Sequence, residues 1–378
     1  MKRPNYKKRK TSHEANPPAQ NDPDTSKPTA VFTPSGGRSH TLSIAIPGSI
    51  IANAQSIDQK TLLAGSLARA LAVFCVDEVI VFDDDENASQ YSNDADTDYP
   101  SPITKPDHLL SGTPPPSKGF TAYSDPSHFL AHVLSYVETP PYLRKLIFPM
   151  HPNLRAAGLL PSLDMPHHLR ANESCEFREG VVAETKPRSN ESIVDTGLPR
   201  KSVLRGIQLP QNARVTVRLA QDGSGSDSGP GPEHAEDEPV HPSTPRTESG
   251  FYWGYYVRRA RSLADVFTEC PFDGGYDLSF GTSERGAPLS SVLGNSPGSA
   301  ALKGFGHLLV VFGGVAGIEA AVRGDSQLSE MGVAPGEAER LFDFWVNMLP
   351  GQGSRTIRTE EAVWLGLSGL RGLVEGNG

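Results

Sequence analysis

The sequence predicts an α/β fold whose parallel sheet is interrupted by a small β-rich insert. Three observations carry this prediction. Residues 41–82 read as strand, helix and strand, residues 178–219 contain several short Val-rich runs, and alternating apolar helices and strands return after residue 262. A strand, helix, strand order favours a parallel sheet, whereas closely spaced short strands are typical of a small barrel.

The first region predicts a βαβ unit. Residues 41–47 and 78–82 are apolar runs of strand length, and residues 58–74 between them carry an apolar stripe with helical period. Residues 126–137 predict a further helix. A basic and aromatic segment, 140–155, follows it, and its cations are candidates for contact with nucleic acid.

The middle region predicts a barrel that could bind nucleic acid. Its expected strands, 178–183, 201–207 and 214–219, are separated by Pro, Asn and Gly, and residues 252–258 follow a long polar loop. Such barrels combine basic groups with aromatic stacking faces. Ordinary exposed strand residues are the alternative for each of the candidates, which are Lys201, Arg205, Arg214, Arg218, Tyr255, Arg258, Arg259 and Arg261.

The last region again predicts alternating helices and strands, as in the first region. Helices are predicted at 262–267 and 316–322, and strands at 276–280 and 308–312. In open α/β sheets, ligands bind beyond the carboxyl ends of the strands. We therefore expect the glycine-containing loops that follow these strands to form a ligand site.

A glycine-rich segment near the C-terminus is the strongest single signal. Residues 347–358 lie between a strand-like run, 341–349, and an apolar helix for which Thr359 is the predicted N-cap. Gly351 and Gly353 permit positive φ and leave main-chain N–H groups available to a ligand. A strand-to-helix turn that binds nothing is the alternative.

Four long segments of the chain resemble a known family, and they are 141–155, 276–286, 305–319 and 347–362. They look like the RNA methyltransferases of the SPOUT superfamily, in the eukaryotic and archaeal subgroup that carries an OB-like insertion. The resemblance implies a SPOUT-type α/β fold with a C-terminal trefoil knot. It also implies an OB-like barrel insert, S-adenosylmethionine held in the knot, an RNA substrate and a homodimer.

Composition and resemblance together give the expected organisation. The chain contains 33 Pro and 37 Gly, and Pro is frequent in Ser-rich and acidic tracts that have too few apolar residues to offset the entropy of ordering, so disorder is expected there. The expected parts are a basic tail at 1–38, a SPOUT domain at 39–165 and 259–373, an insert at 166–258, and disordered acidic loops at 83–118 and 221–249.

Charge is distributed unevenly along the chain. The formal net charge is −9, but acidic residues concentrate in the two loops, so a basic RNA-binding face is compatible with it. The tail opens with Lys2, Arg3, Lys7, Lys8, Arg9 and Lys10. This cluster favours a nuclear address or a nucleic-acid tether, with a nuclear or nucleolar location, and a plain solvated tail is the alternative.

The resemblance also implies which residues approach the cofactor. The loop after residue 311 would pass near the ribose or methionine part, and the loop after residue 348 would approach the adenine through its main chain. The implied cofactor-binding residues are Thr282, Phe312, Gly313, Gly314, Gly317, Leu349, Gly351, Gln352, Gly353, Ser354, Ile357 and Thr359.

Methyl transfer from a sulfonium depends mainly on alignment and charge stabilisation. Arg285, Arg355 and Arg358 are the catalytic candidates because guanidinium groups match phosphate or base acceptors. Glu284 could accept a proton and Glu319 could contact a ribose hydroxyl, but a salt bridge or a cap is the plainer reading of each. The expected RNA-binding residues are Arg144, Lys145, Lys201, Arg205, Arg214, Arg218, Arg258 and Arg259.

Other classes of protein receive less support. Cys75, Cys175 and Cys270 are isolated, so neither a zinc site nor a disulfide framework is expected, and no apolar run is long enough for a membrane span. His128 and His132 lack the glutamate of a zinc-protease motif and predict core or surface positions. In the GxSxG match at 294–298, Pro follows the serine, which argues against a nucleophile elbow.

Two alternatives to an enzyme stay open at this point. A non-catalytic RNA-binding protein, or a scaffold at mitotic or nuclear structures, could retain the fold without turnover. A protein that binds phosphate in the nest at 351–355 would need no methyl donor. Affinity for S-adenosylmethionine separates the second alternative from the methyltransferase.

Overall fold

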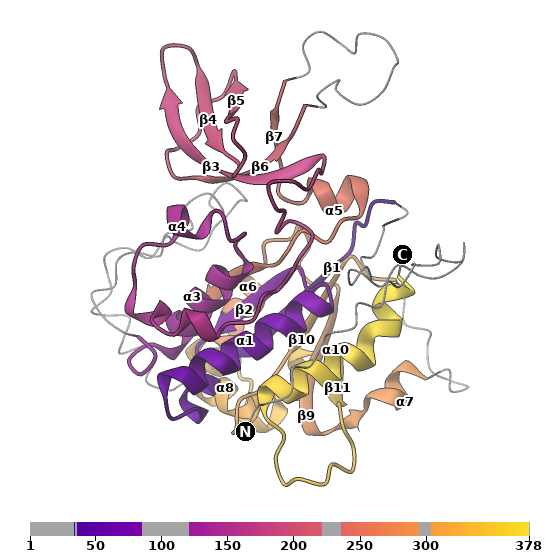
Figure 1. Ribbon diagram of the computed structural model, residues 1–378. Coiled ribbons are helices and arrows are strands. Elements are labelled where there is room, and N and C mark those ends of the chain that lie inside the picture. The colour runs from indigo at the N-terminus through magenta and orange to yellow at the C-terminus, as the bar shows by residue number, and fades with distance from the viewer. Residues whose placement is uncertain (1–33, 35, 85–120, 221–235, 295–303, 378) are drawn as a thin grey trace, which may run out of the picture. The chain divides into compact units, whose positions relative to one another are not determined.

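The computed structural model describes residue 34 and residues 36–84, 121–220, 236–294 and 304–377 (Figure 1). The chain divides into two units, Met1–Pro34 and Ser35–Gly378, and the helices and strands described below belong to the second. Nearly all of the expected basic tail lies outside the described residues, as do residues 85–118 and 221–235 of the two expected acidic loops.

Six parallel strands form the main sheet, in the order β11-β9-β10-β1-β2-β8. Ser56 starts the first helix with a capping box, because its hydroxyl accepts the Gln59 N–H over 3.2 Å. The predicted βαβ unit is confirmed, since β1 and β2 flank this helix and pair in parallel. The strands are β1 (Thr41–Pro47), β2 (Glu78–Phe82), β8 (Tyr256–Ala260), β9 (Leu278–Pro288), β10 (His307–Val311) and β11 (Phe344–Asn347).

Helices cover both faces of the parallel sheet (Figure 1). Helices α1 (Ile57–Val73), α3 (Pro126–Glu138) and α10 (Thr359–Glu375) pack on the face that carries Ile44. Helices α6 (Leu263–Thr268) and α8 (Ile318–Gly324) pack on the face that carries the next residue, Ala45. Strands buried on both faces explain why the sequence shows continuous apolar runs. The short helices are η1 (Gly48–Asn53), α4 (Arg144–Ile147), η3 (Pro152–Leu154), η4 (Ala157–Leu159), α5 (Thr244–Ser249), α7 (Leu289–Leu293), α9 (Ser326–Glu330) and η5 (Pro335–Leu341).

The insert is a five-stranded antiparallel sheet, called sheet B here, with its own apolar core. Its strand order is β5-β4-β3-β6-β7, and the two edge strands approach one another, so the sheet is nearly closed and barrel-like. The predicted β-rich insert is confirmed at this level. The strands are β3 (Phe177–Lys186), β4 (Glu191–Asp195), β5 (Ser202–Arg205), β6 (Arg214–Arg218) and β7 (Glu238–Val240).

Two predictions about the long acidic loop and its exit are wrong. Residues 221–249 were expected to be disordered, but β7 pairs with β6 and α5 follows it. The acids there are neutralised locally, since Arg218 pairs with Glu238 over 2.7 Å. The run 252–258 was assigned to the insert, yet β8 pairs in parallel with β2 of the main sheet. A short apolar run does not show which of two sheets it joins.

Candidate functional site

Loops from four parallel strands begin at one edge of the main sheet. Because β1, β9, β10 and β11 run in the same direction, η1, the irregular part of β9, residues 312–317 and residues 348–358 all start at the carboxyl edge. Ligands of open α/β sheets bind at this edge, where loop N–H groups face outward. This edge is therefore the candidate functional site.

The loop after β10 is a tight glycine turn. The Gly317 N–H donates to the Gly314 carbonyl over 3.1 Å, and the φ of Gly317 is +76°, in the left-handed region that favours glycine. A Cβ at Gly313 would lie 2.7 Å from the Ile318 nitrogen, so this position also requires glycine. The three glycines of the turn leave main chain uncovered at the sheet edge, as a bound ligand would need, while Val315 between them is exposed.

The loop after β11 is joined to this turn through Thr359. Its Oγ1 donates to the Gly313 carbonyl over 3.0 Å. The prediction of Thr359 as the N-cap is wrong by one position: Arg358 is the cap, and its N–H donates to Glu361 Oε2 over 3.0 Å. The Thr359 hydroxyl does not cap the helix; it connects the loop after β11 with the loop after β10. Gly351 has the positive φ expected of this segment, at +75°.

Strand β9 contains a large bulge opposite β11. Trp345 pairs with Gly281, and the next residue, Val346, pairs with Ala287, so residues 282–286 bulge out of the ladder. The sequence predicted a strand that ends at residue 280 and a loop after it. The structure places the loop inside the strand, because pairing with β11 resumes beyond it.

The bulge is fixed to both neighbouring elements. Asn347 Nδ2 donates to the Glu284 carbonyl over 2.8 Å, and Arg285 Nη1 lies 3.4 Å from Glu319 Oε1 at the start of α8. With the Thr359 contact, these interactions connect the three glycine loops that the sequence singled out. The expected convergence of the loops is therefore present at the level of their contacts.

The three catalytic candidates lie on these loops and face solvent. The side chains of Arg285 and Arg358 are 73% and 78% exposed, and Arg358 Nη1 lies 3.8 Å from Glu360. Arg355 is also exposed, and no carboxylate in the described part of the chain lies within ion-pair distance of it. Exposed guanidinium groups beside a ligand site suit the phosphates of an RNA strand.

The cofactor candidates differ in what they can offer a ligand. The Phe312 side chain is 1% exposed and packs beside Gly366 of α10, so only its main chain can reach the site. A Cβ added at Gly353 would have no heavy atom within 4 Å, so there is open space beside this residue. The other candidates in these loops are half-buried or exposed, and they are Thr282, Leu349, Gln352, Ser354 and Ile357.

Sequence reasoning missed a polar pair at the same edge. Ser49 Oγ donates to Asp84 Oδ2 over 2.6 Å, and a Cβ at Gly314 would lie 3.1 Å from that hydroxyl and 3.2 Å from that carboxylate. By composition Asp84 belongs to the acidic loop predicted at 83–118, where no functional residue is expected. Its place directly after the apolar strand β2 is the signal that could have identified it.

The expected RNA-binding residues of sheet B that reach solvent are ion-paired. Exposed pairs of this kind contribute little to stability because water and salt screen them, so a phosphate can replace the carboxylate. The pairs are Lys201 with Asp195, Arg205 with Glu236, and Arg218 with Glu238.

Arg214 and Arg258 are engaged by buried carboxylates. Arg258 is 7% exposed, and its Nε lies 3.1 Å from Glu78 Oε1 inside the parallel sheet. Arg214 contacts two buried carboxylates at the base of sheet B. Tyr255, which was expected on the barrel surface, is 4% exposed. Periodicity alone does not reveal these pairings, because the acidic partners are remote in sequence.

The remaining cations have mixed roles. Arg144 donates to the Val137 and Thr139 carbonyls over 2.8 and 2.9 Å, which ties it to the end of α3. Lys145 beside it is exposed. Arg259 pairs with Asp125 at the start of α3, with 3.0 Å between Nη2 and Oδ1.

The histidine pair on α3 belongs to the core, which is one of the two positions that the sequence left open. His128 and His132 are each 4% exposed, and burial lowers the pKa of the first to about 4 and of the second to about 3. Within the described ranges, no group of three or more His, Cys, Asp or Glu is placed to hold a metal ion. Helices there are also too short or too polar to cross a membrane. The GxSxG match, 294–298, lies almost wholly outside the described residues.

The fold is that of an α/β protein with a candidate site built from loops at the carboxyl edge of its parallel sheet and with an inserted, barrel-like antiparallel sheet. A family model described as "Putative RNA methyltransferase" matches residues 41–370. The chain belongs to this family and is an RNA methyltransferase. The prediction of the enzyme class is thereby confirmed, and a non-catalytic scaffold is not favoured.

Three relatives carry the name 28S rRNA (uridine-N(3))-methyltransferase. The protein from Homo sapiens is 44% identical over 341 residues, which cover 90% of this chain and 80% of the relative. The protein from Mus musculus is 43% identical, with 89% and 77% covered. The protein from Drosophila melanogaster is 40% identical, and the match covers 88% of this chain and 62% of that longer relative.

Proposed function

We propose that the chain transfers a methyl group from S-adenosylmethionine to N3 of a uridine in large-subunit ribosomal RNA. The observation that carries this proposal is the joining of three glycine loops at the carboxyl edge by Thr359, Asn347 and Arg285. The names of the relatives supply the acceptor atom and the RNA class.

The loops offer what this cofactor needs. The turn at Gly313 and Gly317 leaves main chain free to contact a ribose or an amino-acid part, and the open space at Gly353 leaves room for an adenine. Leu349, Gln352 and Ile357 would hold the adenine through their main chain. When bound, S-adenosylmethionine supplies a methyl group already activated by its sulfonium charge.

Uridine N3 carries a proton at neutral pH, so the reaction needs an acceptor for it. We propose Asp84, since its carboxylate lies against Gly314 and is oriented by the Ser49 hydroxyl. The carboxylate takes the N3 proton as the new N–C bond forms. Asp84→Asn should keep cofactor affinity and lose turnover. Full turnover in Asp84→Asn with loss of turnover in Glu284→Gln would assign the role to Glu284 instead.

Arg285, Arg355 and Arg358 would hold RNA phosphates beside the site, because their exposed guanidinium groups lie on two of the loops that form it. Sheet B would grip a more distant part of the RNA, as an OB-like barrel does, through Lys201, Arg205 and Arg218. The expected nuclear or nucleolar location would place the enzyme where ribosomal RNA is made, and imaging of a tagged chain tests it.

The SPOUT knot and the homodimer are also part of the proposal. The path from β11 at the sheet edge to α10, which returns to contact Gly313 and α1, supports a threaded C-terminus. Exposed apolar residues on α1 and α10, namely Leu62, Val73 and Leu365, support a dimer face there. Sedimentation of the wild type and of Leu365→Lys tests this: a wild-type monomer would refute the dimer.

The decisive experiment is methyl transfer by the purified chain. Ribosomal RNA from cells lacking the enzyme is incubated with S-adenosylmethionine, digested and examined for 3-methyluridine by mass spectrometry. We expect one new 3-methyluridine in the large-subunit RNA. Methylation at another atom would change the proposed acceptor, and no methylation by a folded, cofactor-bound protein would refute the proposed substrate.

A further inference from the structure

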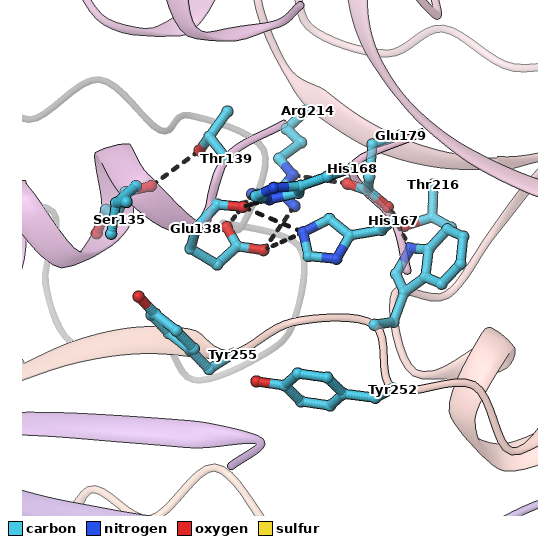
Figure 2. Close-up of polar contacts among 12 residues, drawn as sticks. Ser135, Glu138, Thr139, His167, His168, Glu179, Arg214, Thr216, Tyr252 and Tyr255 are labelled. Carbon is cyan, nitrogen blue, oxygen red and sulfur yellow. Dashed lines mark hydrogen bonds and ion pairs between the residues drawn. The ribbon is translucent and has the colours of Figure 1, made fainter. Parts of the chain in front are cut away.

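Sheet B joins the rest of the molecule at a buried cluster of charges that lies far from the methyl-donor loops. Figure 2 shows its centre, where Arg214 of β6 reaches between Glu138 at the end of α3 and Glu179 of β3. The two segments that connect the sheets, 163–176 and 250–255, contribute His167 and Trp253. We call these five residues the junction cluster.

Every polar group of Arg214 and Glu179 in the cluster is directed at a specific atom. Arg214 donates to Glu138 through Nη1 and Nη2, over 2.6 and 3.1 Å, and to Glu179 Oε2 through Nε, over 2.6 Å. The other oxygen of Glu179 accepts from Trp253 Nε1 over 2.7 Å and from Thr216 Oγ1 over 2.6 Å. Such a bidentate arrangement fixes direction as well as distance.

The surroundings of Glu138 restrict it further. His167 Nε2 lies 2.8 Å from Glu138 Oε1, and His168 Nε2 lies 2.6 Å from the Glu138 carbonyl oxygen. Gly254 has a φ of +86°, and a Cβ there would lie 2.4 Å from Glu138 Oε1. Burial alone would raise the pKa of Glu138, but Arg214 and His167 hold it well below its usual range, so the carboxylate stays ionised.

The cluster lies at the opposite end of α3 from the donor site. Asp125 at the start of α3 pairs with Arg259 at the carboxyl edge, whereas Glu138 at its end packs beside Gly254, just before β8 begins. Helix α3 has 13 residues, which span about 20 Å at the usual helical rise. Figure 1 shows sheet B and the loop after β11 at opposite ends of the parallel sheet. A small rotation of sheet B at the junction cluster would therefore produce a larger displacement of a bound RNA at the carboxyl-edge loops.

A contribution to the free energy of unfolding does not explain this arrangement, because well-packed apolar residues can often replace a buried ion pair without loss of stability. Directed charge pairs do select one geometry. We propose that Glu138 and Arg214 are positioning residues: the junction cluster holds sheet B in one orientation, so that RNA gripped there presents the target uridine to the loops. This inference rests on the proposed function.

The test compares Arg214→Met with Arg218→Met, which lies on the same strand but makes exposed ion pairs. Spin labels at Arg188→Cys in sheet B and at Met331→Cys in the α/β part, in a chain without its native cysteines, report the distance between the two parts. We expect a broadened distance distribution for Arg214→Met and an unchanged one for Arg218→Met.

The catalytic readouts are the KM for ribosomal RNA and the sites of methylation. We expect Arg214→Met to raise the KM at least tenfold and to spread methylation to neighbouring uridines, with S-adenosylmethionine affinity unchanged. If Arg214→Met does not fold, the milder Arg214→Lys variant is measured for the same distances and the same sites of methylation. The proposal would be overturned if the Arg214 variant had the same spin-label distance distribution and the same sites of methylation as the wild type. If no RNA is methylated, an unchanged distance distribution alone would overturn it.

Discussion

At the scale of single residues, Thr359 joins two of the glycine loops at the carboxyl edge, since its hydroxyl donates to the Gly313 carbonyl over 3.0 Å. A neutral hydrogen bond of this kind contributes about 1 kcal/mol. We expect Thr359→Ala to weaken S-adenosylmethionine binding about fivefold in a calorimetric titration. Thr359→Ser keeps the hydroxyl and serves as the control. Equal affinities for Ala and wild type would show that the contact does not shape the site.

Gly286 is the residue that lets the β9 bulge close against β11. A Cβ there would lie 2.5 Å from the Val346 carbonyl carbon, which is main chain and cannot rotate away. We expect Gly286→Ala to lower the free energy of unfolding by about 1–3 kcal/mol, as overpacking does. Urea denaturation measures it. At Gly336 a Cβ meets nothing within 4 Å, so Gly336→Ala should unfold at nearly the wild-type urea concentration.

At the scale of elements, α10 closes the fold over α1 and the sheet. Leu370 is fully buried on its inner face, whereas Leu365 is 38% exposed. We expect Leu370→Ala to lower the free energy of unfolding by about 2–5 kcal/mol through the cavity it leaves. Leu365→Ala should cost much less in the same urea titration. Similar losses for both variants would mean that α10 packs differently.

The elements that the sequence predicted best are the strands buried on both faces. Strands β1 and β2 have the predicted bounds because continuous apolar runs mark parallel strands. Strand β4, with the sequence ESIVD, went unnoticed because it is short and flanked by charge. Its membership of sheet B depends on pairing with β3 and β5, which no local pattern encodes.

The candidate site was predictable in its loops but not in its contacts. Glycines that need unusual φ or close approach, such as Gly313, Gly317 and Gly351, can be recognised from the sequence. The Ser49–Asp84 pair joins residues 35 positions apart, and the Arg214–Glu138 pair joins residues 76 apart. Local periodicity carries no information about such remote partners.

At the scale of the whole molecule, buried histidines make stability depend on pH. Burial lowers the pKa of His128 to about 4, and of His132 and His168 to about 3, from an ordinary value of 6.5. Below pH 6.5 the unfolded chain therefore binds more protons than the folded one, so stability is full above this pH and is lost as the pH falls towards 4. The slope should approach about 1.4 kcal/mol per pH unit for each histidine.

Urea titrations between pH 7 and pH 4.5 measure this slope. His132→Phe keeps an aromatic ring beside Phe148, which His132 stacks on at 5.7 Å, and removes one of the titrating groups. We expect the slope to fall by up to about 1.4 kcal/mol per pH unit in this variant. A stability that rises on acidification, or a slope that His132→Phe leaves unchanged, would contradict the assignment of neutral buried imidazoles.

Methyl transfer by the whole molecule requires that the carboxyl-edge loops bind the methyl donor. The most direct test is calorimetric titration of the wild type and of Gly353→Asp with S-adenosylmethionine and with its demethylated product. We expect the wild type to bind both with micromolar Kd, about −8 kcal/mol, and the folded Gly353→Asp variant to bind neither. No binding by folded wild-type protein, or equal binding by the variant, would contradict the assignment of the site.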